Sequence, residues 1–366
     1  MSFSALLMLA LVLGSLATLA CGTAAAAPGG VVYLAGSGKL YILDAATLAE
    51  RAQLNLGGPV AGMVLDARRH RLDMLVGNAL WVVDPASRRV LDRIGLPFAP
   101  LALGLDRAQQ RAYVLGVTAA GDGRLLALDL DTGRRLAAVS VGRRPSGFTF
   151  SPDGSRILIA DAGARAAVLI TLPGLKPAGI IHLAATPRQA VSLPFGHKAF
   201  VLCGDEVAVL DMRRAALLTY LPVGPQAQAM LVKPDGGEVY VSNAAGNVSV
   251  IDTSTNEISG TMPAGEGAGA MAVAADGSVL DVANAAAGTI SVLSLADRSM
   301  MAVVHVGERP DRLQLGANGL YLFASDAGSD DLAVIRSSQD SNNPNTLITL
   351  LPAPPHLQGL LTASTP

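Results

Sequence analysis

The chain has 366 residues, of which 51% are hydrophobic and 15% charged, so it carries ample material for a buried core and is not a disordered chain. The formal net charge of −2 gives no reason to expect nucleic acid as a partner. The only two cysteines, Cys21 and Cys203, exclude a disulfide framework and a cysteine-built zinc site. Cys203 lies in an apolar run and is expected to be an inert buried thiol. Arginine pairs such as Arg68-Arg69 are expected in solvated turns.

The first residues have the features of an export signal. Residues 4–20 are an uncharged run rich in Leu and Ala, and small residues follow it. This pattern is typical of a secretory signal and is short for a membrane span, although no Lys or Arg precedes it. The motif Leu19-Ala20-Cys21-Gly22 resembles a bacterial lipoprotein box with Cys21 as the lipidated residue, and the alternative is cleavage within residues 23–27. We predict a signal peptide in residues 1–21, a flexible linker in 22–30 and a periplasmic, cell-surface or secreted protein whose only membrane contact would be a lipid on Cys21.

A repeat of about 40 residues begins near residue 31. In the clearest copy, the runs 239–243, 248–252 and 258–262 are short, alternating and rich in β-branched residues, and Asn, Gly, Asp, Ser or Thr separates them. A fourth run, 268–274, ends in a tight Asp-Gly turn. These features predict four strands joined by turns.

The first strand of that copy recurs along the whole chain. Aligned by sequence, its copies start at Tyr33, Met74, Tyr113, Ile157, Phe200, Tyr240, Val282 and Tyr321. Four strands per repeat, with no helical periodicity, predict an all-β fold, a β-propeller of four-stranded antiparallel blades over residues 31–362.

The phase of the repeat predicts how the ring closes. The innermost strand of each blade precedes the tyrosine-type strand, but the chain from Val31 begins without one. The segment 355–361 matches 310–315 in placement, so a C-terminal inner strand would complete the N-terminal blade and leave no open sheet edge. This closure favours eight blades, and seven is the alternative if the segment 331–361 packs differently.

One family resembles this repeat. Tyr240-Val241-Ser242-Asn243, the run 248–252 and Lys233-Pro234-Asp235-Gly236 are similar to the YVTN β-propeller repeat of bacterial and archaeal surface and exported proteins. The resemblance covers residues 31–361 and is clearest in 225–265. It implies a propeller fold and no shared catalytic motif, so it assigns no active-site residue.

The loops that enter the inner strands converge on one mouth of the predicted channel. Arginines gathered there could hold an anionic ligand bidentately, whereas the plainer interpretation is an ordinary solvated face. The predicted ligand-binding residues are Arg143, Arg144, Arg188, Gln226, Gln228, Glu308, Arg309, Asp311, Arg312 and His356.

No motif in the chain indicates a metal or cofactor. The five histidines are scattered and only His356 reaches the mouth, a single Trp argues against a quinone-cofactor propeller, and the absence of Cys-x-x-Cys-His excludes covalent haem. We therefore predict no metal, no cofactor and no catalytic residue.

The leading functional hypothesis is a non-catalytic binding or scaffold propeller outside the cytoplasm. It would hold a small molecule or a protein at the channel mouth. One alternative is a lactonase-type hydrolase that uses Arg188, Glu308, Arg309 and Asp311, and the other is a structural or adhesive protein of the cell surface.

Overall fold

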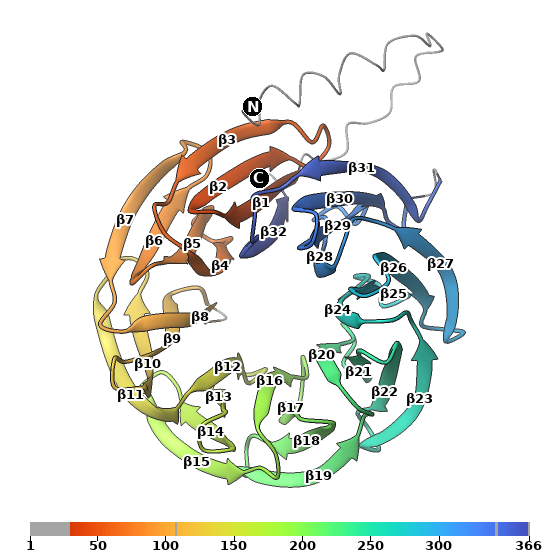
Figure 1. Cartoon of the computed structure of the whole chain (residues 1–366). Coiled ribbons are helices and arrows are strands. Elements are labelled where there is room, and N and C mark those ends of the chain that lie inside the picture. Colours follow the sequence, from red (N-terminus) through yellow and green to blue (C-terminus); the bar gives the residue numbers. More distant parts are fainter. Residues whose placement is uncertain (1–29, 107, 341–342, 365–366) are drawn as a thin grey trace.

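A computed structural model describes residues 30–106, 108–340 and 343–364, with only the backbone of Ser364. The predicted signal peptide, including Cys21, and the linker up to residue 29 lie outside the described residues. Within them, 32 strands form eight four-stranded antiparallel sheets. The sheets stand as blades in a ring around a central axis (Figure 1), which confirms the predicted all-β propeller with eight blades.

The blades are numbered here from the N-terminus, and each is given from its innermost to its outermost strand. Blade 1 contains β32 (Gly359–Ser364), β1 (Gly30–Gly36), β2 (Lys39–Asp44) and β3 (Glu50–Asn55); blade 2 contains β4 (Val60–Asp66), β5 (Arg71–Val76), β6 (Ala79–Asp84) and β7 (Arg89–Gly95). Blade 3 contains β8 (Ala99–Leu105), β9 (Arg111–Val117), β10 (Asp122–Asp129) and β11 (Arg135–Arg143); blade 4 contains β12 (Pro145–Phe150), β13 (Arg156–Asp161), β14 (Ala166–Thr171) and β15 (Lys176–His182).

The second half of the ring follows the same order. Blade 5 contains β16 (Pro187–Ser192), β17 (Lys198–Cys203), β18 (Glu206–Asp211) and β19 (Ala216–Pro222); blade 6 contains β20 (Ala227–Val232), β21 (Glu238–Asn243), β22 (Asn247–Asp252) and β23 (Glu257–Pro263). Blade 7 contains β24 (Ala268–Val273), β25 (Val279–Asn284), β26 (Thr289–Ser294) and β27 (Ser299–His305); blade 8 contains β28 (Pro310–Leu315), β29 (Tyr321–Asp326), β30 (Asp331–Arg336) and β31 (Thr346–Pro352).

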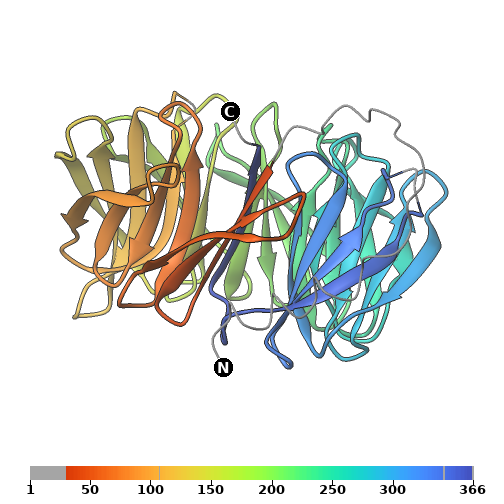
Figure 2. The ribbon, with the colours of Figure 1, turned by 90° about the horizontal axis from the view of Figure 1, so that it is seen from above.

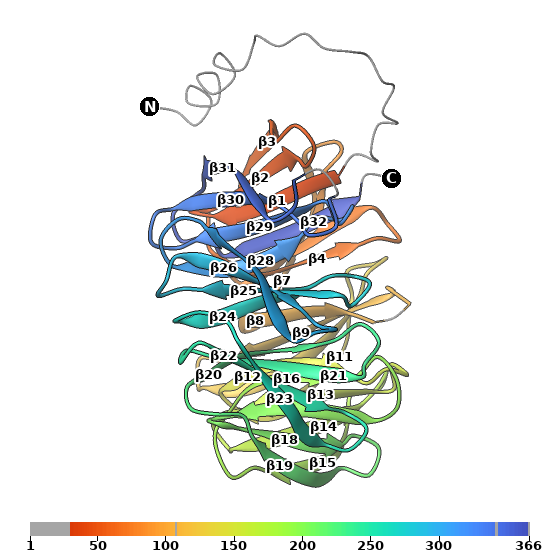
Figure 3. The same ribbon diagram turned by 90° about the vertical axis from the view of Figure 1, so that its right-hand side faces the viewer.

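The C-terminal strand closes the ring as predicted. β32 pairs antiparallel with β1, with Leu361 opposite Tyr33. The edge-on views in Figures 2 and 3 show β32 beside β1, although the two strands lie at opposite ends of the described chain. The strand begins at Gly359, later than expected, and the preceding loop is tied to blade 1 because the Gln358 amide donates a 2.7 Å hydrogen bond to the Ala35 carbonyl.

The core is divided among the interfaces between blades. In β1, Val31, Tyr33 and Ala35 face blade 2, whereas Val32 and Leu34 face blade 8. The middle strands of every blade are buried on both faces in this way, which explains why they read as nearly continuous apolar runs. Each blade is therefore held by its two neighbours.

One buried position recurs in every blade and points toward the next blade. The strand registers place the following residues there: Tyr33, Asp73, Tyr113, Leu158, Phe200, Tyr240, Asp281 and Phe323. The sequence alignment with Tyr33 was wrong by one residue at Met74, Ile157 and Val282 and by two residues at Tyr321. Tyr33 lies opposite Ile42, and the equivalent pairs are Asp73 with Val82, Leu158 with Leu169, Asp281 with Val292 and Phe323 with Val334. Two of the eight blades thus place a carboxyl group where the others place an aromatic side chain or a leucine.

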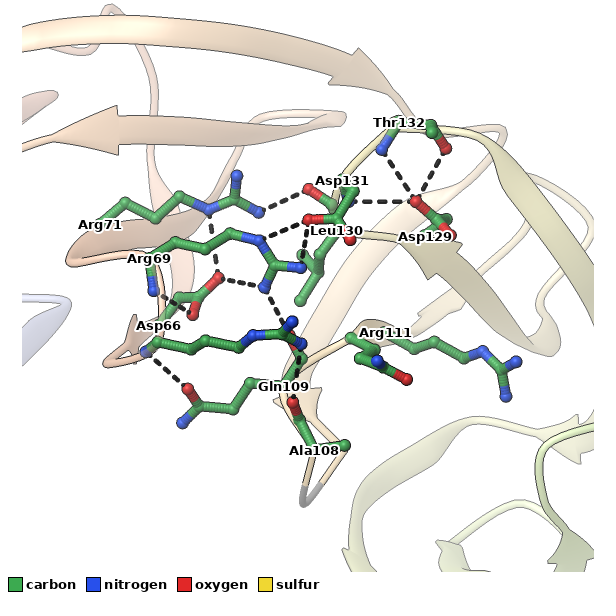
Figure 4. A network of polar contacts seen from close by, with 12 residues as sticks. Asp66, Arg69, Arg71, Ala108, Gln109, Arg111, Asp129, Leu130, Asp131 and Thr132 are labelled. Atoms are coloured by element: carbon green, nitrogen blue, oxygen red, sulfur yellow. Dashed lines mark hydrogen bonds and ion pairs between the residues drawn. The ribbon is translucent and has the colours of Figure 1, made fainter.

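Blades 2 and 3 are joined by a polar network on the face opposite the mouth (Figure 4). The Arg69 guanidinium pairs with Asp66 at 3.0 Å and with Asp131 of blade 3, and Arg71 donates a 2.9 Å hydrogen bond to the Leu130 carbonyl. The Arg69 side chain is only 15% exposed, so the expectation of a solvated turn is wrong for this residue.

Candidate functional site

The mouth face is formed by the loops that enter the inner strands and by the turns between the second and third strands of each blade. All ten residues predicted for this face are exposed. They flank the starts of five inner strands, β12, β16, β20, β28 and β32, and so are distributed around much of the ring.

A repeated left-handed residue shapes the entry to four of these strands. Arg144, Gln226, Arg309 and His356 have φ values of 55°, 57°, 55° and 53°. Non-glycine residues rarely adopt this conformation, and it persists only where surrounding contacts hold it. For the first three, the carbonyl accepts an amide hydrogen bond from the turn of the same blade, at 3.2, 3.0 and 3.0 Å. Sequence analysis did not predict these left-handed residues, because no sequence pattern distinguishes an arginine in this conformation.

Two predicted arginines bridge adjacent blades. Arg188 Nη2 donates to the Ala227 carbonyl of blade 6, and Arg312 Nε donates a 3.3 Å hydrogen bond to the Leu357 carbonyl at the entry to blade 1. These bonds hold the guanidinium groups against the backbone of the next blade. Arg143 and Arg144 lie between blades 3 and 4, so the predicted arginines occupy separate sectors of the ring.

Three hollows of about 250, 640 and 520 Å³ are sunk into the mouth face between blades 6 and 1. Five predicted residues line at least one of them: Gln228, Glu308, Arg309, Asp311 and His356. The other five line none of the three: Arg143, Arg144, Arg188, Gln226 and Arg312.

The smallest hollow, called here the blade 8 pocket, is acidic. Its lining residues include Asp311, Asp326, Asp330, Asp331 and His356. The Arg312 guanidinium lies at the pocket wall, where its Nε donates to the Leu357 carbonyl. Sequence analysis selected only Asp311 and His356 from this group. The run of three Asp residues around the turn after β29 was the available signal.

Asp326 is the most buried carboxyl of this pocket. It is 1% exposed, and its Oδ2 accepts a 3.1 Å hydrogen bond from the Gly307 amide. Its Oδ1 is buried and has no hydrogen-bond donor within the described residues. Burial, aided by the nearby Asp331 and Asp311 and opposed by the hydrogen bond from Gly307, raises the pKa of Asp326 to about 7. The Ser325 hydroxyl donates a 2.5 Å hydrogen bond to Asp311 Oδ1.

In the described part of the chain, no group of three or more His, Cys, Asp or Glu side chains is arranged to hold a metal ion. The same residues contain no helix long and apolar enough to cross a membrane.

Comparison with known proteins shows the fold. No family model and no curated protein matches the chain. Among solved structures, dihydro-heme d1 dehydrogenase NirN in complex with DHE is 13% identical with a TM-score of 0.75, covering 96% of this chain and 78% of that chain. Kuenenia stuttgartiensis hydrazine synthase is 17% identical with a TM-score of 0.57, covering 74% of this chain and 93% of that one. The Cps50 (Swd1) β-propeller domain of Myceliophteria thermophila is 16% identical with a TM-score of 0.55, covering 72% and 96%. At these identities the likeness establishes a β-propeller and no particular activity.

Proposed function

We propose that this chain is an exported, non-catalytic binding propeller that holds a positively charged group of its ligand or partner in the blade 8 pocket. The observation that carries the proposal is the set of four aspartates around a hollow of about 250 Å³, one of them buried with an oxygen that has no donor in the described residues.

Electrostatics favours a cationic ligand at this place. A buried carboxylate oxygen without a donor is unfavourable, and a charged N–H group supplies the strongest available partner. Four aspartates line the pocket, and its lining residues include no Lys or Arg. An ammonium or guanidinium ion fits better than a metal ion, because the acidic side chains do not converge into a coordinating group.

Export is part of the proposal and rests on the sequence alone. The uncharged run 4–20 followed by Cys21 supports either a lipoprotein or a secreted protein. Fractionation of cells that express the wild type and Cys21→Ser tests it. Membrane association that Cys21→Ser abolishes would support lipidation, release of both forms would support plain secretion, and retention of both in the cytoplasm would contradict export.

Binding is tested with 1,4-diaminobutane as the probe, by isothermal titration calorimetry. We expect binding by the wild type and a loss of about ten-fold in affinity for Asp331→Asn, because one charge-assisted contact disappears. The matched control is Asp297→Asn, which removes an exposed carboxyl in a turn on the opposite face and should leave affinity unchanged.

Succinate, a dianion of similar length, should not bind the blade 8 pocket. Equal binding of succinate and the diamine, or equal affinity of the wild type and Asp331→Asn for the diamine, would contradict a cation site in this pocket.

A second candidate function follows from the pKa of Asp326. A carboxyl group with a pKa of about 7 at a pocket wall suits a general base, which a lactonase-type hydrolase requires. Hydrolysis of a γ- or δ-lactone by the wild type and its loss in Asp326→Asn would favour this alternative. Binding of the diamine without turnover of any lactone would favour the binding propeller.

A further inference from the structure

We propose a second binding site on the opposite face of the ring, at the interface between blades 1 and 2, that takes an amphipathic monocarboxylate. The site is a cavity of about 430 Å³, called here the seam pocket. Its apolar wall comprises Val31, Tyr33, Ile42, Ala52, Leu65 and Ala363, and its rim carries Arg51, His70 and Arg88. Its volume lies within the range of pockets that hold small organic molecules, about 300–1,000 Å³.

Comparison with another interface of the same ring explains the cavity. Between blades 3 and 4, Tyr113 occupies the position of Tyr33 and packs edge-to-face on Phe150, with 5.6 Å between ring centroids. The register places Leu65 of blade 2 at the position of Phe150, because Leu65 lies opposite Leu72 as Phe150 lies opposite Ile157. A smaller side chain therefore stands where a phenyl ring fills the equivalent space.

A second difference lies in the turn between the third and fourth strands. In blade 4 this turn contributes Leu175, which has φ 51° and is buried in the cluster around Tyr113. Arg88 occupies the same place in blade 2, with φ 60°, and its side chain is exposed. Replacing a buried leucine by an exposed arginine opens the cavity and places a cation at its rim.

Tyr33 provides the polar group of the interior. The residue is 3% exposed and lines the cavity, and its hydroxyl has no hydrogen-bond partner within the described residues. Tyr240, at the equivalent position of blade 6, donates a 2.6 Å bond to Glu238 Oε2, whereas the Tyr33 hydroxyl opens on the cavity. A ligand oxygen inside the seam pocket would supply the partner that Tyr33 lacks.

The charges of the rim select an anionic head group. Arg51 pairs with Asp44, whereas Arg88 makes no ion pair within the described residues. The nearby Asp84 is occupied locally, since its carboxyl accepts hydrogen bonds from Ser87 and from the Ala86 amide. A carboxylate at the rim would pair with Arg88, while its hydrocarbon chain would cover the apolar wall.

Octanoate is the probe for this site, and its binding is measured by calorimetry and by ligand-observed saturation-transfer NMR. We expect the wild type to bind octanoate in preference to octylamine, which has the same chain and the opposite charge. Leu65→Phe, which copies the blade 4 interface, should abolish binding without lowering the unfolding midpoint.

Arg88→Gln should weaken octanoate binding by about ten-fold, because it removes a charge-assisted contact. Arg134→Gln is the matched control, since Arg134 is exposed in a turn of blade 3 on the same face, away from the seam pocket. The proposal would be overturned by absence of octanoate binding, by unchanged binding to a folded Leu65→Phe variant, or by equal affinity for octylamine.

Discussion

The carboxyl group of Asp281 destabilises the folded ring at neutral and alkaline pH. Asp281 faces the apolar interface between blades 7 and 8, among residues such as Val279, Ala283 and Leu322. It is 4% exposed and has no hydrogen bond or ion pair within the described residues. Burial alone raises the pKa of Asp281 to about 7. Asp73 differs, because its carboxyl lies 3.2 Å from the Arg71 guanidinium.

The size of the effect follows from this pKa. Against an ordinary value of 3.8, a folded-state pKa of about 7 means that ionising Asp281 costs about 4 kcal/mol of stability at high pH. The raised pKa means that the folded state binds the proton more tightly than the unfolded state. The favourable contribution of the neutral group is therefore complete below the unfolded pKa and is lost as the pH rises through 7. Between pH 5 and pH 8 the loss is about 2.5 kcal/mol.

Urea unfolding of Asp281→Asn and the wild type at pH 5 and pH 8 checks this reasoning. We expect the stability of the variant to fall less over this range, by about 2.5 kcal/mol, because it has no proton to lose. Asp281→Leu, which copies Leu158 of blade 4, should exceed the wild type in stability at pH 8. Asp297→Asn serves as the control with unchanged pH dependence. An Asp281→Asn profile parallel to that of the wild type would refute the assignment of a buried, unpaired carboxyl group.

Three further predictions concern other buried contacts. Cys203 is 1% exposed, and burial raises the pKa of its thiol to about 12. In a Cys21→Ser chain, Ellman's reagent should therefore react with Cys203 only after denaturation. Reaction in the native protein would contradict this burial. Tyr240→Phe should lose about 1 kcal/mol in urea unfolding, because its hydroxyl bonds Glu238, and an unchanged midpoint would show that this bond contributes nothing. Truncation after Gln358 removes β32 and exposes the edge of β1. We expect a lower unfolding midpoint by circular dichroism and aggregation by light scattering. An equally stable monomer would argue against closure by β32.

The repeat and its phase were sufficient to predict the propeller. Alternation of short apolar runs with Asn, Asp and Gly turns defined the strands, and the missing inner strand before Val31 identified the C-terminal segment as its replacement. Local patterns determine both features, so a single sequence contains them.

The same pattern did not predict which neighbouring blade each side chain faces. Strands such as β5 are buried on both sides, so no contrast between polar and apolar residues marks which residue faces which blade. The sequence therefore aligned Met74 with Tyr33, and the equivalence of Asp73 and Asp281 to the aromatic residues and the leucine of other blades stayed hidden. Only the hydrogen-bond register reveals it.

The candidate sites were predictable to different extents. Topology alone placed all ten predicted residues on one face, because every loop into an inner strand emerges there. The sequence did not show which of them border a hollow, since that depends on the packing of neighbouring blades. The sequence did not predict the seam pocket. The cavity arises because blade 2 places Leu65 and Arg88 where blade 4 places Phe150 and Leu175, and these residues are distant in the sequence.

Both proposed sites depend on the closing segment of the ring. His356 and Gln358 line the blade 8 pocket and Ala363 lines the seam pocket, while Gln358 Oε1 accepts a 2.7 Å hydrogen bond from the Val60 amide of blade 2. A ligand that binds only the closed ring must stabilise closure by the free energy of its binding. Either probe should therefore raise the unfolding midpoint of the wild type, and neither should do so after truncation at Gln358. Closure of the ring is therefore a condition for binding at both faces. A rigid scaffold with preformed sites on separate blades would not need a closed ring to bind either ligand.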